Sequence, residues 1–148
     1  MEKQRVFRLK SNENCTTEKM IIAGNYDYVN RNVNGKNFPM RPRLAGTRII
    51  EMIKFNHEST SEDVIAEAKR RGLERPTYED ALNFGEQFPE KQKKQSLPFL
   101  HEPWRGPGGR RDVIVLDGGP SGRGLSLGWF GGKWARRCAF PFVRIIRK

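Results

Sequence analysis

The C-terminal segment, residues 124–144, constrains the fold of this chain most strongly. Between residues 125 and 129 apolar side chains alternate with small or polar ones, which is typical of a strand with one buried face. A glycine pair follows, and the run from 134 to 146 predicts another strand. Pro141 inside that run predicts an edge position or a bulge, because proline cannot donate a backbone hydrogen bond. The segment therefore predicts two strands joined by a glycine turn.

Capping signals predict two helices in the middle of the chain. A capping box of Ser59 with Glu62, or the same pairing one residue later, begins a helix that ends at Gly72. A second box pairs the cap Thr77 with Asp80, and Pro89 ends the helix that follows. Caps of this kind also explain the paired carboxylates in both first turns, so we do not expect an acid–base pair there.

Weaker local patterns predict the remaining elements. They are an edge strand within 1–10, a short helix that is capped within 16–18 and ends at Gly24, a loop-rich segment at 25–43, a strand at 44–57, a charged connector at 90–95, and strands at 97–104 and 111–117. Together these elements predict a single α+β domain over residues 1–148. Two central capped helices, within 59–89, are expected to pack on a mainly antiparallel β-sheet formed largely by the C-terminal half, 97–147.

The chain is strongly basic, and its charge is unevenly distributed. The net charge of +11 at pH 7 comprises +6 from residues 1–57, −3 from 58–102 and +8 from 103–148. Such an excess favours an anionic partner, namely nucleic acid, an acidic protein or an anionic membrane surface. The alternative is that the charge only keeps the chain in solution.

The sequence predicts a reduced, cytoplasmic protein. No apolar run approaches the roughly 18 residues that suggest a membrane span, and the N-terminus lacks the apolar centre of a signal peptide. The two cysteines, Cys15 and Cys138, allow one disulfide but form no disulfide framework.

No constellation of residues predicts catalysis, a metal or a cofactor. The glycine-rich stretch 118–124 lacks the Gly-Lys-Ser/Thr end of a phosphate loop and leads into a strand pattern, so it predicts a turn between strands. His57 and His101 are not spaced as metal ligands. Cys138 with either histidine is a formal nucleophile–base pair, but nothing in the sequence orients it.

Arginine and aromatic residues alternate through the C-terminal third, and this pattern is the best functional signal. Arginine binds phosphate in a bidentate manner, and an exposed tryptophan stacks on a base. The candidate polyanion-binding residues are Trp104, Arg105, Arg110, Arg111, Arg123, Lys133, Trp134, Arg136, Arg137 and Arg144. In the alternative interpretation, Trp129, Phe140 and Phe142 belong to the core and the arginines form a solvated rim. The two interpretations differ in one point: polyanion binding requires Trp104 and Trp134 to be exposed beside the arginines.

Several short motifs carry a resemblance to known proteins. Segments 25–30, 36–39, 75–77, 127–130 and 140–144 resemble those of a group of short bacterial proteins of uncharacterised function. Pro76-Thr77 and Phe142-Val143-Arg144 distantly resemble C-type lectin-like domains of the formylglycine-generating-enzyme type. The second resemblance implies a lectin-like fold. It does not imply calcium-dependent sugar binding, because the Trp-Asn-Asp calcium motif is missing. A catalytic cysteine pair is not carried over either.

We therefore expect a non-enzymatic basic binding module for nucleic acid or another polyanion. The first alternative is a protein–protein interaction module on a C-type-lectin-like scaffold. The second alternative is an enzyme of unknown reaction.

Overall fold

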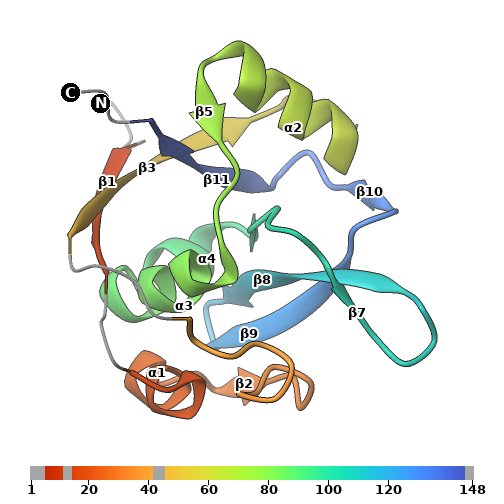
Figure 1. Ribbon diagram of the computed structural model, residues 1–148. Helices are drawn as coiled ribbons and strands as arrows, with labels where there is room; N and C mark the ends of the chain where they lie inside the picture. Colours follow the sequence, from red (N-terminus) through yellow and green to blue (C-terminus); the bar gives the residue numbers. More distant parts are fainter. Residues whose placement is uncertain (1–5, 12–14, 42–45, 146–148) are drawn as a thin grey trace.

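The computed structural model describes residues 6–11, 15–41 and 46–145. One four-stranded antiparallel sheet draws its strands from both ends of the chain (Figure 1). In spatial order it contains β1 (Val6–Lys10), β3 (Thr47–Lys54), β11 (Ala139–Arg144) and β5 (Leu73–Glu74). The first strand of the chain is thus an edge strand, as predicted, and its expected residues 1–5 lie outside the described part.

The second sheet is built around a long hairpin. In spatial order it contains β2 (Tyr28–Val29), β9 (Gly122–Trp129), β8 (Arg111–Gly119) and β6 (Leu97–Pro98), and β7 (Trp104–Arg105) pairs with another part of β8. β2 runs parallel to β9, and the other pairs are antiparallel. A third, two-stranded sheet joins β4 (Ser59–Thr60) to β10 (Lys133–Trp134).

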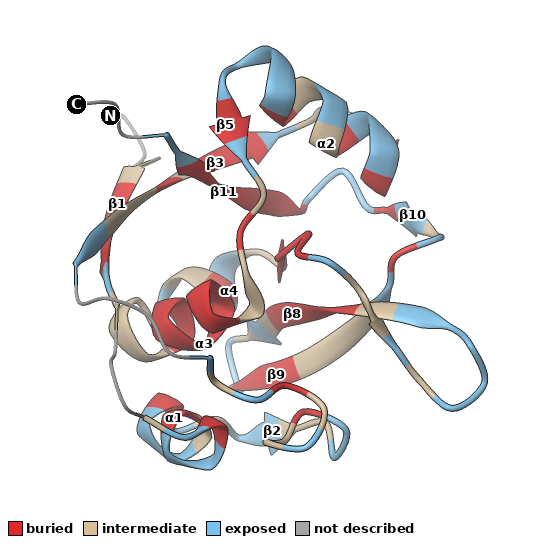
Figure 2. Cartoon of the chain, in the orientation of Figure 1, coloured by how far each residue is buried: buried red, intermediate tan, exposed pale blue. Residues whose placement is uncertain are grey.

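The helices fill and flank the space between the larger sheets. They are α1 (Thr17–Gly24), α2 (Ser61–Arg70), α3 (Tyr78–Gln87) and α4 (Lys91–Lys94). α3 contacts α1, β1 and β8, and its residues 79–85 are all buried. α2 packs against β4 and β5, and its outer side is exposed (Figure 2). None of the helices in the described part of the chain has the length and apolar content needed to cross a bilayer.

Two clusters of apolar side chains form the core. The first includes Phe7, Phe38, Phe84 and Phe99, and it joins α1 and α3 to β1, β8 and β9. The second includes Val64, Trp134, Phe140 and Phe142, and it joins α2 to β3, β10 and β11. Strands β8 and β11 contribute alternate side chains to the two clusters, so the clusters lie on opposite faces of these strands.

The structure confirms an α+β fold with mainly antiparallel strands and corrects its details. The strands form three sheets rather than one, because β3 pairs with β1 and β11 while the hairpin pairs separately. Segment 97–104 is split into β6 and β7, the last predicted strand is split into β10 and β11, and the connector contains the short helix α4.

The helix caps and Pro141 can be compared directly with their predictions. The α2 cap is Thr60, whose hydroxyl accepts a hydrogen bond from the backbone of Asp63, so the cap lies at the second of the two predicted positions. α3 has a complete capping box, as predicted. Pro141 pairs with Met52 on one side and lies beyond the reach of β5 on the other, because β5 pairs only with residues 143 and 144. β11 is therefore an inner strand rather than the predicted edge strand, and it accommodates Pro141 at a position paired on one side only.

Candidate functional site

Two tryptophans and an aspartate lie across three neighbouring strands at one end of the hairpin sheet. Asp112 of β8 pairs with Trp104 of β7 on one side and with Trp129 of β9 on the other. Paired residues of neighbouring strands share a face, so these three side chains project to the same side. Trp104 is half-buried with its ring centroid 5.8 Å from that of Phe38, whereas Trp129 is 53% exposed.

The expectation that Trp129 belongs to the core is wrong. Burial decreases along its face of β9, from Leu125, which is fully buried, through Leu127, which is half-buried, to Trp129. The strand extends past the packed helices, so its last apolar residue emerges into solvent. Phe140 and Phe142 are buried, as that interpretation expected.

The indole of Trp129 rests on backbone instead of on side chains. It lies against Gly131 and Gly132, where an added Cβ would come within 3.0 Å of the ring. Arg110 lies on the same side with its guanidinium carbon 5.8 Å from the ring centroid, and its Nε donates to Asp112 Oδ1 over 2.8 Å. The glycines thus support the ring, and Asp112 orients the arginine beside it.

Five candidate cations in the C-terminal third are exposed and have no carboxylate partner within the described residues. They are Arg105, Arg111, Lys133, Arg136 and Arg137. Arg105 and Arg111 face each other across β7 and β8. Like charges in opposed positions destabilise a sheet, so this pair is not explained by stability.

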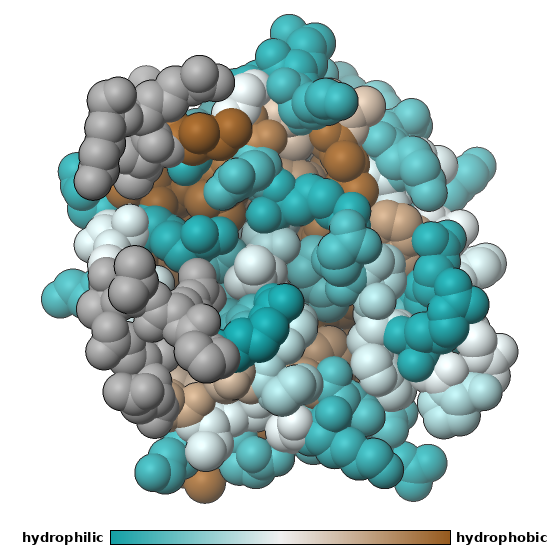
Figure 3. Space-filling view, viewed as in Figure 1, coloured by the Kyte–Doolittle hydropathy of each residue, from teal (hydrophilic) through white to brown (hydrophobic). Residues whose placement is uncertain are grey.

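We define the basic strand end as Arg105, Arg110, Arg111, Trp129 and Lys133. The five residues lie where β7 and β9 end and where β8 and β10 begin. Figure 3 shows mainly hydrophilic residues on the side of the molecule where β7 and β10 are placed in Figure 1. Arg136 and Arg137 follow β10 in the turn that leads to β11. The basic strand end thus contains four of the eight predicted cations.

Arg123 is a correction, because its side chain is buried and structural. Its guanidinium donates to the carbonyl oxygens of Gly24 and Gly85 and to Gln92 Oε1, and it lies 4.6 Å from the ring centroid of Tyr26. Gly24 and Gly85 belong to the last turns of α1 and α3, where carbonyls lack helical partners and the helix dipole is negative. The residue joins two helix ends and is not available to a polyanion.

Two further candidates are also engaged elsewhere. Trp134 is only 9% exposed, and its Nε1 donates to Ser61 Oγ over 2.9 Å, so the expectation that it is exposed is wrong. Arg144 is exposed but pairs with Glu51 of β3 over 2.7 Å. Burial and pairing remove both from the candidate surface.

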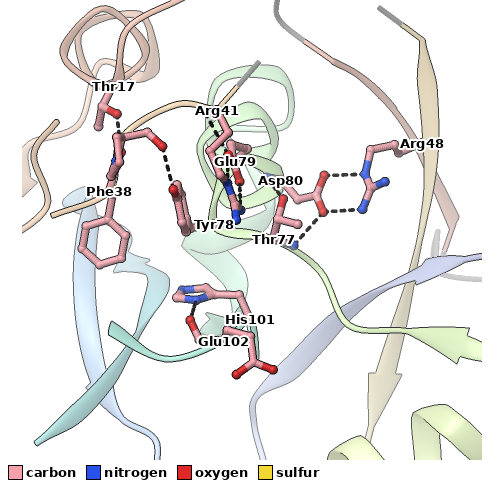
Figure 4. A network of polar contacts seen from close by, with 11 residues as sticks. Thr17, Phe38, Arg41, Arg48, Thr77, Tyr78, Glu79, Asp80, His101 and Glu102 are labelled. Carbon is pink, nitrogen blue, oxygen red and sulfur yellow. Dashed lines mark hydrogen bonds and ion pairs between the residues drawn. The ribbon is translucent and has the colours of Figure 1, made fainter. Parts of the chain in front are cut away.

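An ionic network with two buried carboxylates, which the sequence did not reveal, lies at the start of α3 (Figure 4). Arg41 donates through two nitrogens to Glu79, at 2.6 and 2.7 Å, and Arg48 donates in the same way to Asp80, at 2.7 and 2.9 Å. Burial opposes ionisation of Glu79, but its hydrogen bonds with Arg41 outweigh this and hold its pKa below the ordinary value. The network neutralises two arginines of the basic N-terminal third.

The histidine and cysteine candidates have structural surroundings. His101 Nε2 accepts from the backbone of Ile114, which leaves Nδ1 to donate to the carbonyl of Glu102. Burial lowers the pKa of His101 to about 4, so the ring is neutral. Burial also raises the pKa of Cys138, and both it and Cys15 are free thiols. Within residues 6–11, 15–41 and 46–145, no three His, Cys, Asp or Glu side chains are grouped as metal ligands.

The glycine-rich stretch forms the turn of the β8–β9 hairpin, as predicted. The last pair is Gly119 with Gly122, so the turn has two residues. Beside it lies an open hollow of about 510 Å³ whose lining includes Asp27 and Asp117. Two carboxylates repel phosphate, which agrees with the interpretation of this stretch as a turn.

Comparisons with known proteins gave no relatives. No family model, no curated protein and no solved structure matches this chain. The resemblances suggested by short motifs therefore stay predictions, and the geometry of the basic strand end carries the functional proposal.

Proposed function

We propose that this chain is a non-enzymatic module that binds a polyanion, with nucleic acid as the favoured ligand. The observation that carries the proposal is the opposed pair Arg105 and Arg111, exposed and without a carboxylate partner in the described residues. A phosphate placed between them would relieve their repulsion and accept bidentate hydrogen bonds from either guanidinium. Lys133, Arg136 and Arg137 extend the positive charge along the same part of the chain.

Binding of this kind gains free energy from the release of counterions. Each neutralised phosphate contributes a slope of about −0.9 for duplex DNA, or about −0.7 for a single strand, to a plot of log affinity against log salt. Contacts from all five unpaired cations would give a slope of roughly −3.5 to −4.5. The affinity should therefore fall steeply as salt is raised.

The non-enzymatic part of the proposal is supported by the state of the reactive groups. Both ring nitrogens of His101 are engaged with backbone atoms, so neither can act on a substrate. The raised pKa of Cys138 disfavours the thiolate that a nucleophile needs. An enzyme of unknown reaction stays the second alternative, because His57 is exposed.

The test measures fluorescence polarisation of labelled RNA and DNA at two salt concentrations. The double variant Arg105→Ala/Arg111→Ala should lower the affinity and flatten the salt slope by about 1.4 to 1.8. Arg8→Ala/Arg31→Ala removes the same charge at two exposed sites on β1 and after β2, and should have a much smaller effect. Absence of binding at low salt, or equal weakening by both double variants, would refute the proposal.

The first alternative is a protein–protein interaction module on a C-type-lectin-like scaffold. Its supporting observation is the exposure of large apolar side chains away from the basic strand end, namely Ile22 on α1 at 77% and Tyr28 on β2 at 57%. This alternative requires a partner that the chain retains after nuclease treatment and at high salt, and loss of the partner under either condition would exclude it.

A further inference from the structure

We infer that the ligand is a single-stranded nucleic acid, one of whose bases stacks on Trp129. This inference rests on the proposed polyanion binding and adds the class of polymer. Its starting point is that Trp129 exposes 53% of its surface between strand ends whose Arg105 and Arg111 have no carboxylate partner among the described residues.

The surroundings of Trp129 suit a stacking platform. Gly131 and Gly132 hold the ring from beneath, and a hydrogen bond from Gly132 N to the carbonyl of Trp129 closes the turn over 3.2 Å. The ring is therefore supported by backbone before any ligand arrives, which reduces the ordering required on binding. Base–aromatic stacking tolerates any sequence, because every base has an aromatic face.

Cations that can bind the phosphates of the polymer lie on the opposite face of the same strand ends. Side chains alternate along a strand, so Arg105 and Arg111 project from the face opposite to Trp104, Asp112 and Trp129. Arg111 confirms this placement, because its guanidinium carbon lies 5.1 Å from the ring centroid of the buried Phe130. A strand that stacks a base on Trp129 can pass around the sheet end and place its phosphates at the two arginines.

This arrangement favours a single strand over a duplex. In a duplex the base faces are covered by neighbouring bases, and only the base edges are exposed in the grooves. The basic strand end presents the exposed Trp129 ring with the Arg110 guanidinium 5.8 Å from its centroid, and stacking on this pair needs an unstacked base. Unpaired bases supply that face without the cost of opening a helix.

The experiment compares three probes with wild-type protein and variants. The probes are a labelled oligothymidine, a DNA duplex of the same length, and heparin as a polyanion without bases. Trp129→Ala should weaken oligothymidine binding about 5- to 150-fold, the range expected for loss of one stacked base. It should leave heparin binding unchanged, and Trp129→Phe should retain most of the oligothymidine affinity.

Tyr28→Ala is the matched control, because it removes an exposed aromatic side chain from β2, which pairs with the opposite end of β9 from Trp129. It should change none of the affinities. A second measurement uses tryptophan fluorescence, which oligothymidine should quench in the wild type and much less in Trp129→Phe.

The outcomes separate the two levels of the proposal. If no probe binds at low salt, the proposed function fails and this inference fails with it. If heparin and duplex bind as tightly as oligothymidine, or Trp129→Ala weakens all three equally, polyanion binding stands and the stacking inference is overturned.

Discussion

Arg123 offers the sharpest test of the fold, because a buried cation joins the ends of two helices. Its guanidinium bonds with Gly24 of α1, Gly85 of α3 and the side chain of Gln92. Only 7% of the residue is exposed. The substitution Arg123→Met keeps most of the side-chain length and apolar volume while removing every donor.

The expected loss of stability follows from the hydrogen-bond acceptors that no longer have a donor. Three oxygens, those of Gly24, Gly85 and Gln92, lose the hydrogen bonds that Arg123 donates to them. Each lost bond costs on the order of 1 kcal/mol net, so we expect the free energy of unfolding to fall by about 3 kcal/mol. Removing the buried charge also removes its desolvation penalty, which makes the loss of stability smaller. Loss of the contact between the guanidinium and the Tyr26 ring makes it larger.

Urea unfolding followed by circular dichroism measures this change, with Arg136→Met as the matched control. Arg136 is exposed and makes no ion pair in the described structure, so the same substitution there should change the free energy by less than about 0.5 kcal/mol. Equal stability of Arg123→Met and the wild type would refute the assignment of Arg123 as the link between α1 and α3. So would a destabilisation that disappears at high salt, since buried contacts are screened little.

Two further predictions concern the core. The folded pKa of His101, about 4, lies below its ordinary value of 6.5, so the unfolded chain gains a proton first and stability should decrease as pH falls from 6.5 to about 4. His101→Gln should reduce this slope in urea unfolding at several pH values, and an unchanged slope would contradict the assignment. Gly128→Ala would place a Cβ 2.8 Å from the ring of Trp134 and 2.9 Å from Val115, and should cost about 1–3 kcal/mol. Gly119→Ala meets no atom within 4 Å, and equal melting temperatures for the two variants would count against the packing of Trp134 on β9.

Much of the candidate site was predictable because its residue types are concentrated in one third of the chain. Arg105, Arg110, Arg111 and Lys133 were candidates from sequence, and the structure places them together. The sequence did not predict that Trp129 is exposed. Alternation along a strand shows which residues share a face, but it does not show where the residues that bury this face end. The glycine pair that follows it was the available signal for a strand ending in solvent.

Local interactions between residues close in sequence explain what the sequence determined by itself. The caps of α2 and α3 and the hairpin turn depend on neighbours a few residues apart, and the structure contains them. Pairings over long sequence separations were decided only by tertiary structure. Arg41 meets Glu79 across 38 positions, and Arg123 meets Gly24 across 99, because the sheets bring those backbones together. Which charges are buried, which are paired and which stay free for a ligand is therefore a property of the packed chain, since desolvation and Coulomb energy depend on distance in space.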